Sequence, residues 1–219
     1  MDLSFALLLV TASGAGRGEG GDGSRADAYA SIDVALAVET EDALLRGAEE
    51  ARQRAVERVR TTPASYAPPV LHAVAHVLLT RGDLEGAAFW SHAAELRARF
   101  DARRCADPSA AAAVPELGRD DRARIQAHDR EDLARLEVLV AHVIAWDRRT
   151  PHAYDPRWIN VFGVLSLLSA HPRSARRGPV ALSVPTRLWD ALAEETRGAY
   201  LAEVKAGLQR GAPPEASTP

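Results

Sequence analysis

The sequence predicts an all-α protein, a helical domain built from antiparallel helix hairpins. Alanine, leucine, arginine and glutamate dominate its periodic segments, and alternating runs of β-branched residues are scarce. Apolar residues recur with the three-to-four-residue spacing of amphipathic helices. The chain has 219 residues, 47% of them hydrophobic, which is enough for one sizeable core or two small ones. We therefore expect a single helical domain over residues 26–210 and a disordered tail over 211–219.

The first 25 residues are expected to stand apart from this domain. Leu3–Val10 is a short apolar run, and Ser13 and Ala15 behind it have the small-x-small spacing of a signal-peptidase site. No Lys or Arg precedes the run, so a flexible apolar tail is the alternative to a signal peptide. Residues 16–25 are glycine-rich and predict a flexible linker. Apart from this leader no integral membrane segment is expected, because no stretch is long and uncharged enough.

Residues 40–60 are predicted to form one helix that ends before Thr61-Thr62-Pro63. The segment is charged and rich in alanine, and its apolar residues fall on one helical face. This face consists of Leu45, Ala48, Ala55, Val56 and Val59.

The window 68–101 reads PPVLHAVAHVLLTRGDLEGAAFWSHAAELRARFD and predicts a helical hairpin. Gly82 suits the left-handed position after the first helix, and Asp83 can cap the second. The facing residues are apolar and often small: Leu71, Val74, Ala75 and Leu78, then Ala87, Trp90 and Ala94. Because small residues let two helices approach closely, the window resembles a tetratricopeptide unit. Neither flank repeats the Gly-Asp turn, so we expect a lone hairpin rather than a repeat array.

The second half of the chain continues the helical pattern. Residues 106–118 contain two prolines and small residues, and they predict a loop. Asp129 is predicted to cap a helix that ends near Asp147. The buried stripe of that helix is Leu133, Leu136, Val140, Val143 and Ile144. Ile159–Ala170 predicts a buried helix, with a strand as the alternative, and Thr186–Arg210 predicts a final amphipathic helix.

Composition and motifs give little support for an enzyme. The net charge of −3 and the pI near 6.2 provide no basic field, so no nucleic-acid partner is expected. Cys105 is the only cysteine, which excludes an intrachain disulfide and predicts a buried structural thiol. The sequence contains no GxSxG elbow and no phosphate loop. We expect no cofactor.

Three histidines are the candidates for metal chemistry. His72 and His76 lie four residues apart and can share a helix face, and His92 lies across the predicted turn. No HExxH motif accompanies them, and histidines on an apolar helix usually pack against their neighbours. The sequence therefore predicts no metal site, and a site formed by all three histidines is the alternative.

The segment Trp146–Asn160 is dense in aromatic, charged and amide groups, which are typical of binding loops. The candidate binding residues are Tyr154, Asp155, Arg157 and Trp158, joined by Trp90 and Arg97 from the hairpin. The alternative is a structured corner whose aromatic rings fold onto the core.

Two blocks of the sequence together resemble an uncharacterised family of bacterial helical proteins, many of them apparently exported. The first block is Phe89-Trp90, Leu96-Arg97-x-Arg99 and Cys105-x-Asp107. The second is Trp146-Asp147, Pro151 and Tyr154-Asp155-x-Arg157-Trp158-Ile159-Asn160. The resemblance covers residues 82–163. It implies export but brings no activity with it.

Two functions are consistent with these observations. The first is a non-enzymatic protein- or peptide-binding module of the bacterial cell envelope, with an unidentified partner and a periplasmic or otherwise exported location. The second is a small hydrolase or metal-dependent enzyme that uses His72, His76 and His92. A cytoplasmic location is the alternative to export.

Overall fold

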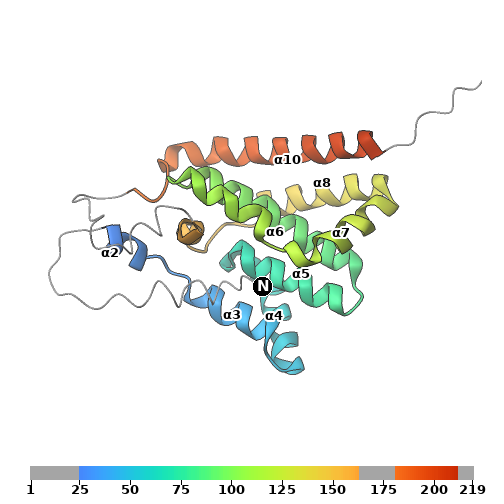
Figure 1. Ribbon diagram of the computed structural model, residues 1–219, viewed down its shortest axis with the longest axis horizontal. Helices are drawn as coiled ribbons and strands as arrows, with labels where there is room; N and C mark the ends of the chain where they lie inside the picture. Colours follow the sequence, from blue (N-terminus) through green and yellow to red (C-terminus); the bar gives the residue numbers. More distant parts are fainter. Residues whose placement is uncertain (1–24, 163–180, 212–219) are drawn as a thin grey trace, which may run out of the picture.

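The computed structural model describes residues 25–162 and 181–211, and it confirms the all-α class (Figure 1). Within these ranges no strand occurs, and an isolated antiparallel bridge joins Cys105 to Ser183. The predicted signal run Leu3–Val10 and the residues 163–170 and 212–219 lie outside the described parts of the chain. None of the described helices combines the length and the apolar character that crossing a membrane requires.

The chain begins with helices α2 (Arg25–Ala30), α3 (Ala35–Leu45) and α4 (Glu49–Thr61). A short 3-10 turn, η1 (Pro63–Ser65), then leads into the central hairpin. In α4 the predicted residues Ala55, Val56 and Val59 are buried, whereas Leu45 and Ala48, near the break between α3 and α4, are exposed.

The prediction of one continuous helix over residues 40–60 is wrong, because the chain breaks at Gly47. A Cβ atom on Gly47 would lie 2.3 Å from the carbonyl oxygen of Ala43, so this bend accepts only glycine. Arg52 stabilises the bend by donating Nε to the carbonyl of Leu44 at 3.0 Å and Nη2 to that of Gly47 at 3.2 Å. The freed carbonyls are thus satisfied by a side chain.

The central hairpin consists of α5 (Pro68–Thr80) and α6 (Leu84–Arg104), the most extensively packed helix pair. Its turn is the predicted one: Gly82 has φ +81°, and the Asp83 carboxylate accepts the backbone N–H of Gly86 at 2.9 Å. The small residues Ala75, Ala87 and Ala94 are buried where the helices meet. The hairpin is therefore present, and its kinship with tetratricopeptide units stays a prediction.

We expect Gly82→Ala to lower the free energy of unfolding by about 1–2 kcal/mol, because an L side chain is strained at this positive φ. Gly198→Ala is the matched control: Gly198 is helical, and an added Cβ meets nothing within 4 Å. Alanine there should raise the free energy of unfolding by roughly 0.5–1 kcal/mol. Urea denaturation measures the free energy of unfolding of both variants. If both change it by the same amount in the same direction, the left-handed conformation of Gly82 does not explain the effect.

After α6 the chain forms the 3-10 helix η2 (Pro108–Glu116) and the helix α7 (Arg119–Glu131). The loop predicted over residues 106–118 is therefore mostly 3-10 helix, because Asp107 caps it through the backbone N–H of Ser109 at 3.0 Å. Gly118, which has φ +63°, is the N-cap residue of α7.

Helix α8 (Leu133–Arg149) is present, but the prediction that Asp129 caps it is wrong. Asp129 lies inside α7, and Asp132 is the cap, accepting the backbone N–H of Arg135 at 2.9 Å. The predicted stripe is buried at Leu136, Val140, Val143 and Ile144, while Leu133 is only partly buried.

The last elements are η3 (Pro156–Phe162), η5 (Thr186–Leu188) and α10 (Trp189–Gly211). The described start of the predicted helix Ile159–Ala170 is thus 3-10 helix, and the final helix is confirmed. Figure 1 shows α5 and α6 between the α3–α4 pair on one side and α10 with α8 on the other. One buried cluster surrounds α5, and a second joins α6, α8 and α10. Phe89 and Trp146 pack against both clusters.

Candidate functional site

The aromatic rings of the corner Trp146–Asn160 pack onto the protein core. Trp158 and Arg97 have exposed fractions of 0%, and Trp90 and Tyr154 are also buried. The ring of Trp90 meets that of Trp146 edge to face, with centroids 5.7 Å apart. These four candidate binding residues therefore have almost no surface for a partner, which favours the structured-corner interpretation.

Asp101 on α6 holds this corner together. Its carboxylate, with an exposed fraction of 0%, accepts the indole N–H of Trp158 at 2.6 Å and the hydroxyl of Tyr154 at 3.0 Å. Arg104 donates to the same carboxylate at 2.5 and 2.9 Å. Burial, together with the negative charge of Asp101, raises the pKa of Tyr154 well above its usual value. The phenol therefore stays protonated and remains a donor.

Asp147 at the end of α8 is a second buried hub. Arg97 donates Nε to its Oδ1 at 2.9 Å, and Arg197 from α10 donates to its Oδ2 at 2.6 and 2.9 Å. His152 lies 2.9 Å from Oδ1. Burial alone would raise the pKa of Asp147, but His152, Arg97 and Arg197 outweigh it and hold that pKa well below the usual range. The hub therefore carries a carboxylate at every physiological pH.

Asp155 and Arg157 are the two candidate residues that stay partly exposed, and they pair with each other at 2.6 Å. Asp155 also accepts the backbone N–H of Asp33 at 2.9 Å, and Arg157 donates to the carbonyl of Ser31 at 2.7 Å. These contacts tie the connection between α2 and α3 to η3. Both side chains are thus occupied in holding the chain together.

The three histidines do not converge on one site. His76 pairs with Asp121 at 2.9 Å, and His92 lies between Tyr200 and Asp129. Over residues 25–162 and 181–211, no group of three or more His, Cys, Asp or Glu side chains is placed to hold a metal ion. The metal site considered from the sequence therefore has no counterpart in this part of the chain.

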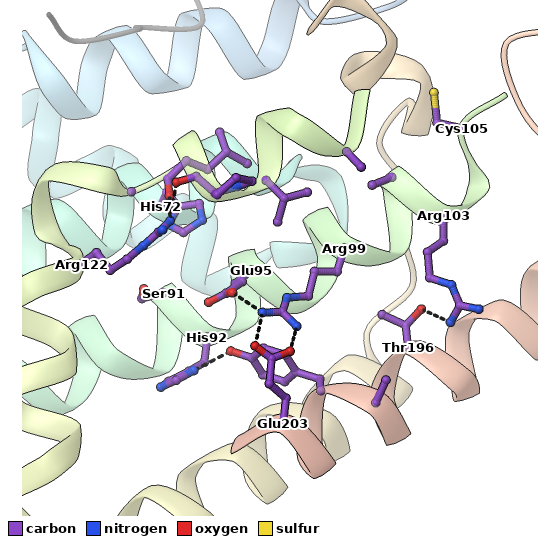
Figure 2. Close-up of a pocket in the computed structure, with 18 of the residues that line it drawn as sticks. His72, Ser91, His92, Glu95, Arg99, Arg103, Cys105, Arg122, Thr196 and Glu203 are labelled. Carbon is purple, nitrogen blue, oxygen red and sulfur yellow. Dashed lines mark hydrogen bonds and ion pairs between the residues drawn. The ribbon is translucent and has the colours of Figure 1, made fainter. Parts of the chain in front are cut away.

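A cavity of about 980 Å³ lies between α6, η2, α7 and α10, and we call it the α6–α10 cavity (Figure 2). Its volume is at the upper end of the range found for small-molecule sites. Its apolar lining comes from all four elements: Ala102, Pro108, Ala111, Val114, Pro115, Leu117, Ile125 and Ala199, with Val184 beside them. His72, from α5, and Arg122 lie at one end, and Cys105, Arg103 and Thr196 lie at the other (Figure 2).

A band of paired charges crosses the middle of the cavity. Arg99 on α6 donates to Glu95 at 2.7 Å and to Glu203 of α10 at 2.5 and 3.2 Å. Its guanidinium also lies over the ring of Tyr200, 4.9 Å from the centroid. The band therefore links α6 to α10, two of the helices that line the cavity.

His92, Tyr200 and Asp129 form a hydrogen-bonded chain beside this band. His92 Nδ1 lies 2.6 Å from the Tyr200 hydroxyl, and Nε2 lies 3.3 Å from the Asp129 carboxylate. Since the carboxylate only accepts, Nε2 donates to it, and in the neutral ring Nδ1 then accepts from the phenol. Burial raises the pKa of Tyr200 well above its usual value, so this phenol keeps its proton. All three groups are satisfied by one another.

Cys105 lies at the end of the cavity opposite to His72. It is buried, as the sequence predicts, and its Sγ lies 3.1 Å from the Asn160 side-chain oxygen. Burial raises the pKa of the thiol. This environment is that of a structural thiol rather than of a nucleophile.

Of the residues that line the cavity, the sequence singles out His72, His92 and Cys105, but not as parts of one site. Tyr200 and Glu203 are three residues apart in the predicted final helix, so they share a face. Nothing in the sequence indicates that this face meets Arg99, which lies 104 residues from Glu203. Only the fold brings these groups together.

No protein-family model, curated protein or solved structure matches the chain. The resemblance to exported bacterial helical proteins therefore stays a prediction. Any function must be argued from the cavity itself.

Proposed function

We propose that this chain is a non-enzymatic helical binding protein whose ligand occupies the α6–α10 cavity. The observation that carries the proposal is a cavity of about 980 Å³ with mainly apolar walls and a band of internally paired charges. Sites of this kind bury most of a ligand against apolar walls and orient it with a few polar groups. The binding surface predicted from the sequence thus moves from the Trp146–Asn160 corner to the opposite face of α6.

The polar groups of the cavity support binding rather than catalysis. Arg99 is neutralised by two carboxylates, and His92 is held between Tyr200 and Asp129. A general base needs a lone pair free for the substrate, and a nucleophile needs an adjacent base. Arg99, His92, Tyr200 and Asp129 are thus already committed to partners within the protein. Binding of a mainly apolar ligand requires neither a general base nor a nucleophile.

An exported location accompanies this proposal as an expectation. It rests on the apolar run and small-x-small site near the amino terminus. Cell fractionation of the source bacterium, followed by immunoblotting, measures it directly. Recovery in the cytoplasmic fraction would contradict export and leave the binding proposal intact.

The binding proposal predicts that Ala199→Trp abolishes uptake of an uncharged apolar dye, N-phenyl-1-naphthylamine. Ala199 is an exposed residue of α10 that lines the cavity, so an indole there occupies the ligand volume. Fluorescence titration of the wild-type protein should show saturable binding, weakened at least about tenfold in the variant, which corresponds to 1.4 kcal/mol.

Ala202→Trp is the matched control. Ala202 is exposed on the same helix, three residues later, and does not line the cavity. Its dye affinity should equal that of the wild type. Equal loss in both variants, or no saturable binding by the wild type, would refute the assignment of the cavity as the binding site.

A further inference from the structure

His72 is an imidazole in the protein interior that makes no hydrogen bond within the described chain. Its Nε2 is inaccessible to solvent and has no hydrogen-bond partner. Its Nδ1 faces Gly118, where a Cβ atom would lie only 2.6 Å away. A buried polar group without a partner costs about 1–3 kcal/mol, so such groups call for an explanation. The other histidines discussed above, His76, His92 and His152, all have carboxylate partners.

The position of His72 links it to a ligand. The residue projects from α5 into the end of the α6–α10 cavity formed by Leu117, Gly118 and Arg122 (Figure 2). It also lines a second cavity of about 510 Å³, whose lining likewise includes Leu117 and Gly118. A ligand in the larger cavity therefore lies against the ring of His72.

His72 is uncharged at neutral pH. Burial lowers its pKa to about 4, Glu95 acts in the opposite direction, and the positive charge of Arg122 lowers the pKa further. A neutral imidazole offers one donor and one acceptor. Since Nε2 is inaccessible to solvent, a hydroxyl group pairs with Nδ1, and because it can both donate and accept, it does so in either tautomer.

The other charges of the cavity are balanced. Three arginines line it, namely Arg99, Arg103 and Arg122, and three carboxylates, namely Glu95, Asp129 and Glu203. Arg122 donates Nη2 to the carbonyls of Pro115 and Leu117 at 2.6 and 3.1 Å. Arg122 is thus held by carbonyls rather than by a carboxylate, but the six charges sum to zero, so the cavity has no net charge that would favour an ionic ligand over an uncharged one.

We infer that the α6–α10 cavity binds an uncharged, mainly apolar small molecule that carries a hydroxyl group, and that His72 recognises this group. The inference rests on the proposed function and adds the chemical class of the ligand. The apolar part of the molecule lies on apolar residues of the cavity lining, such as Val114, Leu117 and Ile125. His72 is a positioning and specificity residue, and no bond is made or broken.

Three probes with one alkyl chain and different head groups test this inference: 1-octanol, octanoate and octylammonium. Each displaces N-phenyl-1-naphthylamine from the wild-type protein in a fluorescence competition at pH 7. We expect 1-octanol to bind about tenfold more tightly than either charged probe. The neutral peptide acetyl-Leu-Leu-Leu-amide is a fourth probe, and it should compete less well than 1-octanol.

His72→Leu removes the hydrogen-bonding ring and keeps an apolar side chain, so the Kd of 1-octanol should rise about tenfold while dye binding persists. His76→Leu is the matched control on the same helix, because His76 does not line the α6–α10 cavity. It should leave the 1-octanol Kd unchanged. A second variant, His72→Gln, retains a donor and an acceptor and should restore most of the preference for 1-octanol.

Nitrogen-15 NMR of the histidine rings provides an independent readout on the wild-type protein. Addition of 1-octanol should shift the ring nitrogens of His72 and leave those of His76 in place.

Each other outcome overturns the inference. Tighter binding of octanoate, octylammonium or the peptide would assign a different ligand class. An unchanged 1-octanol Kd in His72→Leu would remove His72 from recognition, even though the cavity still binds the dye. Failure of 1-octanol to displace a dye that itself responds to Ala199→Trp would likewise overturn the ligand class and leave the proposed function standing.

Discussion

Replacing Asp101 by alanine should lower the free energy of unfolding by about 3–5 kcal/mol, the loss seen when one member of a buried charge pair is removed. The change leaves the buried guanidinium of Arg104 without its carboxylate. It also removes the acceptor of the Tyr154 hydroxyl and of the Trp158 indole. Urea denaturation followed by tryptophan fluorescence and far-UV circular dichroism measures the effect.

Asp42→Ala is the control for this prediction. Asp42 pairs with Arg46 at 2.6 Å on the surface of α3, with both side chains more than half exposed. Exposed pairs of this kind contribute about 0.5 kcal/mol or less. A loss below about 1 kcal/mol in Asp101→Ala would show that the corner is held by its apolar packing alone.

Asp147→Asn should lower the free energy of unfolding at pH 7 by about 3 kcal/mol, because it leaves the fully buried Arg97 without a counter-charge. The pKa of Asp147 is lower in the folded than in the unfolded chain. Its contribution is therefore complete above the unfolded pKa, near 3.9, and is lost as the pH falls toward the folded value.

The difference between wild type and Asp147→Asn should accordingly shrink when the pH falls below about 4. Urea denaturation at pH 7, 4 and 3 measures it. Glu194→Gln is the control, since Glu194 is an exposed partner of Arg197 and Arg148 and should change stability by less than about 1 kcal/mol. A difference that stays constant over this pH range would contradict the role of the Asp147 carboxylate.

The elements that sequence could predict are those with strong local signals. The turn at Gly82 and Asp83 is predictable because it depends on two local effects, the left-handed backbone of Gly82 and the cap formed by Asp83. Both effects involve residues at most four positions apart in the sequence. The buried stripe of α8 follows from its helical period. The sequence does not predict helix α7, because the segment RDDRARIQAHDRE has almost no apolar stripe. Its buried face includes the polar residues His128 and Asp129, and Asp129 is partnered by His92 of α6.

The candidate site could be predicted only in part, because its groups are distant in sequence. The density of aromatic and charged residues marks the Trp146–Asn160 segment as unusual. Composition alone, however, cannot distinguish aromatic rings that bind a partner from aromatic rings that pack onto the core. The burial of Arg97 depends on Asp147, 50 residues away. The α6–α10 cavity depends on where α10 lies, which no local pattern encodes.

Exposed ion pairs join helix α10 to α6 and α8, in addition to the apolar contacts of Tyr200, Leu201 and Val204. Glu203, Glu195 and Glu194 are well exposed in their pairs with Arg99, Arg103 and Arg148. At 1 M salt the Debye length falls to about 3 Å, which screens exposed pairs but not the buried bond between Arg197 and Asp147. High ionic strength should therefore weaken these three pairs, while the Arg197–Asp147 bond and the buried Tyr200 keep α10 in place. Two of the pairs are formed by Arg99 and Arg103, which line the cavity, so the rate at which a ligand enters should depend on the salt concentration outside.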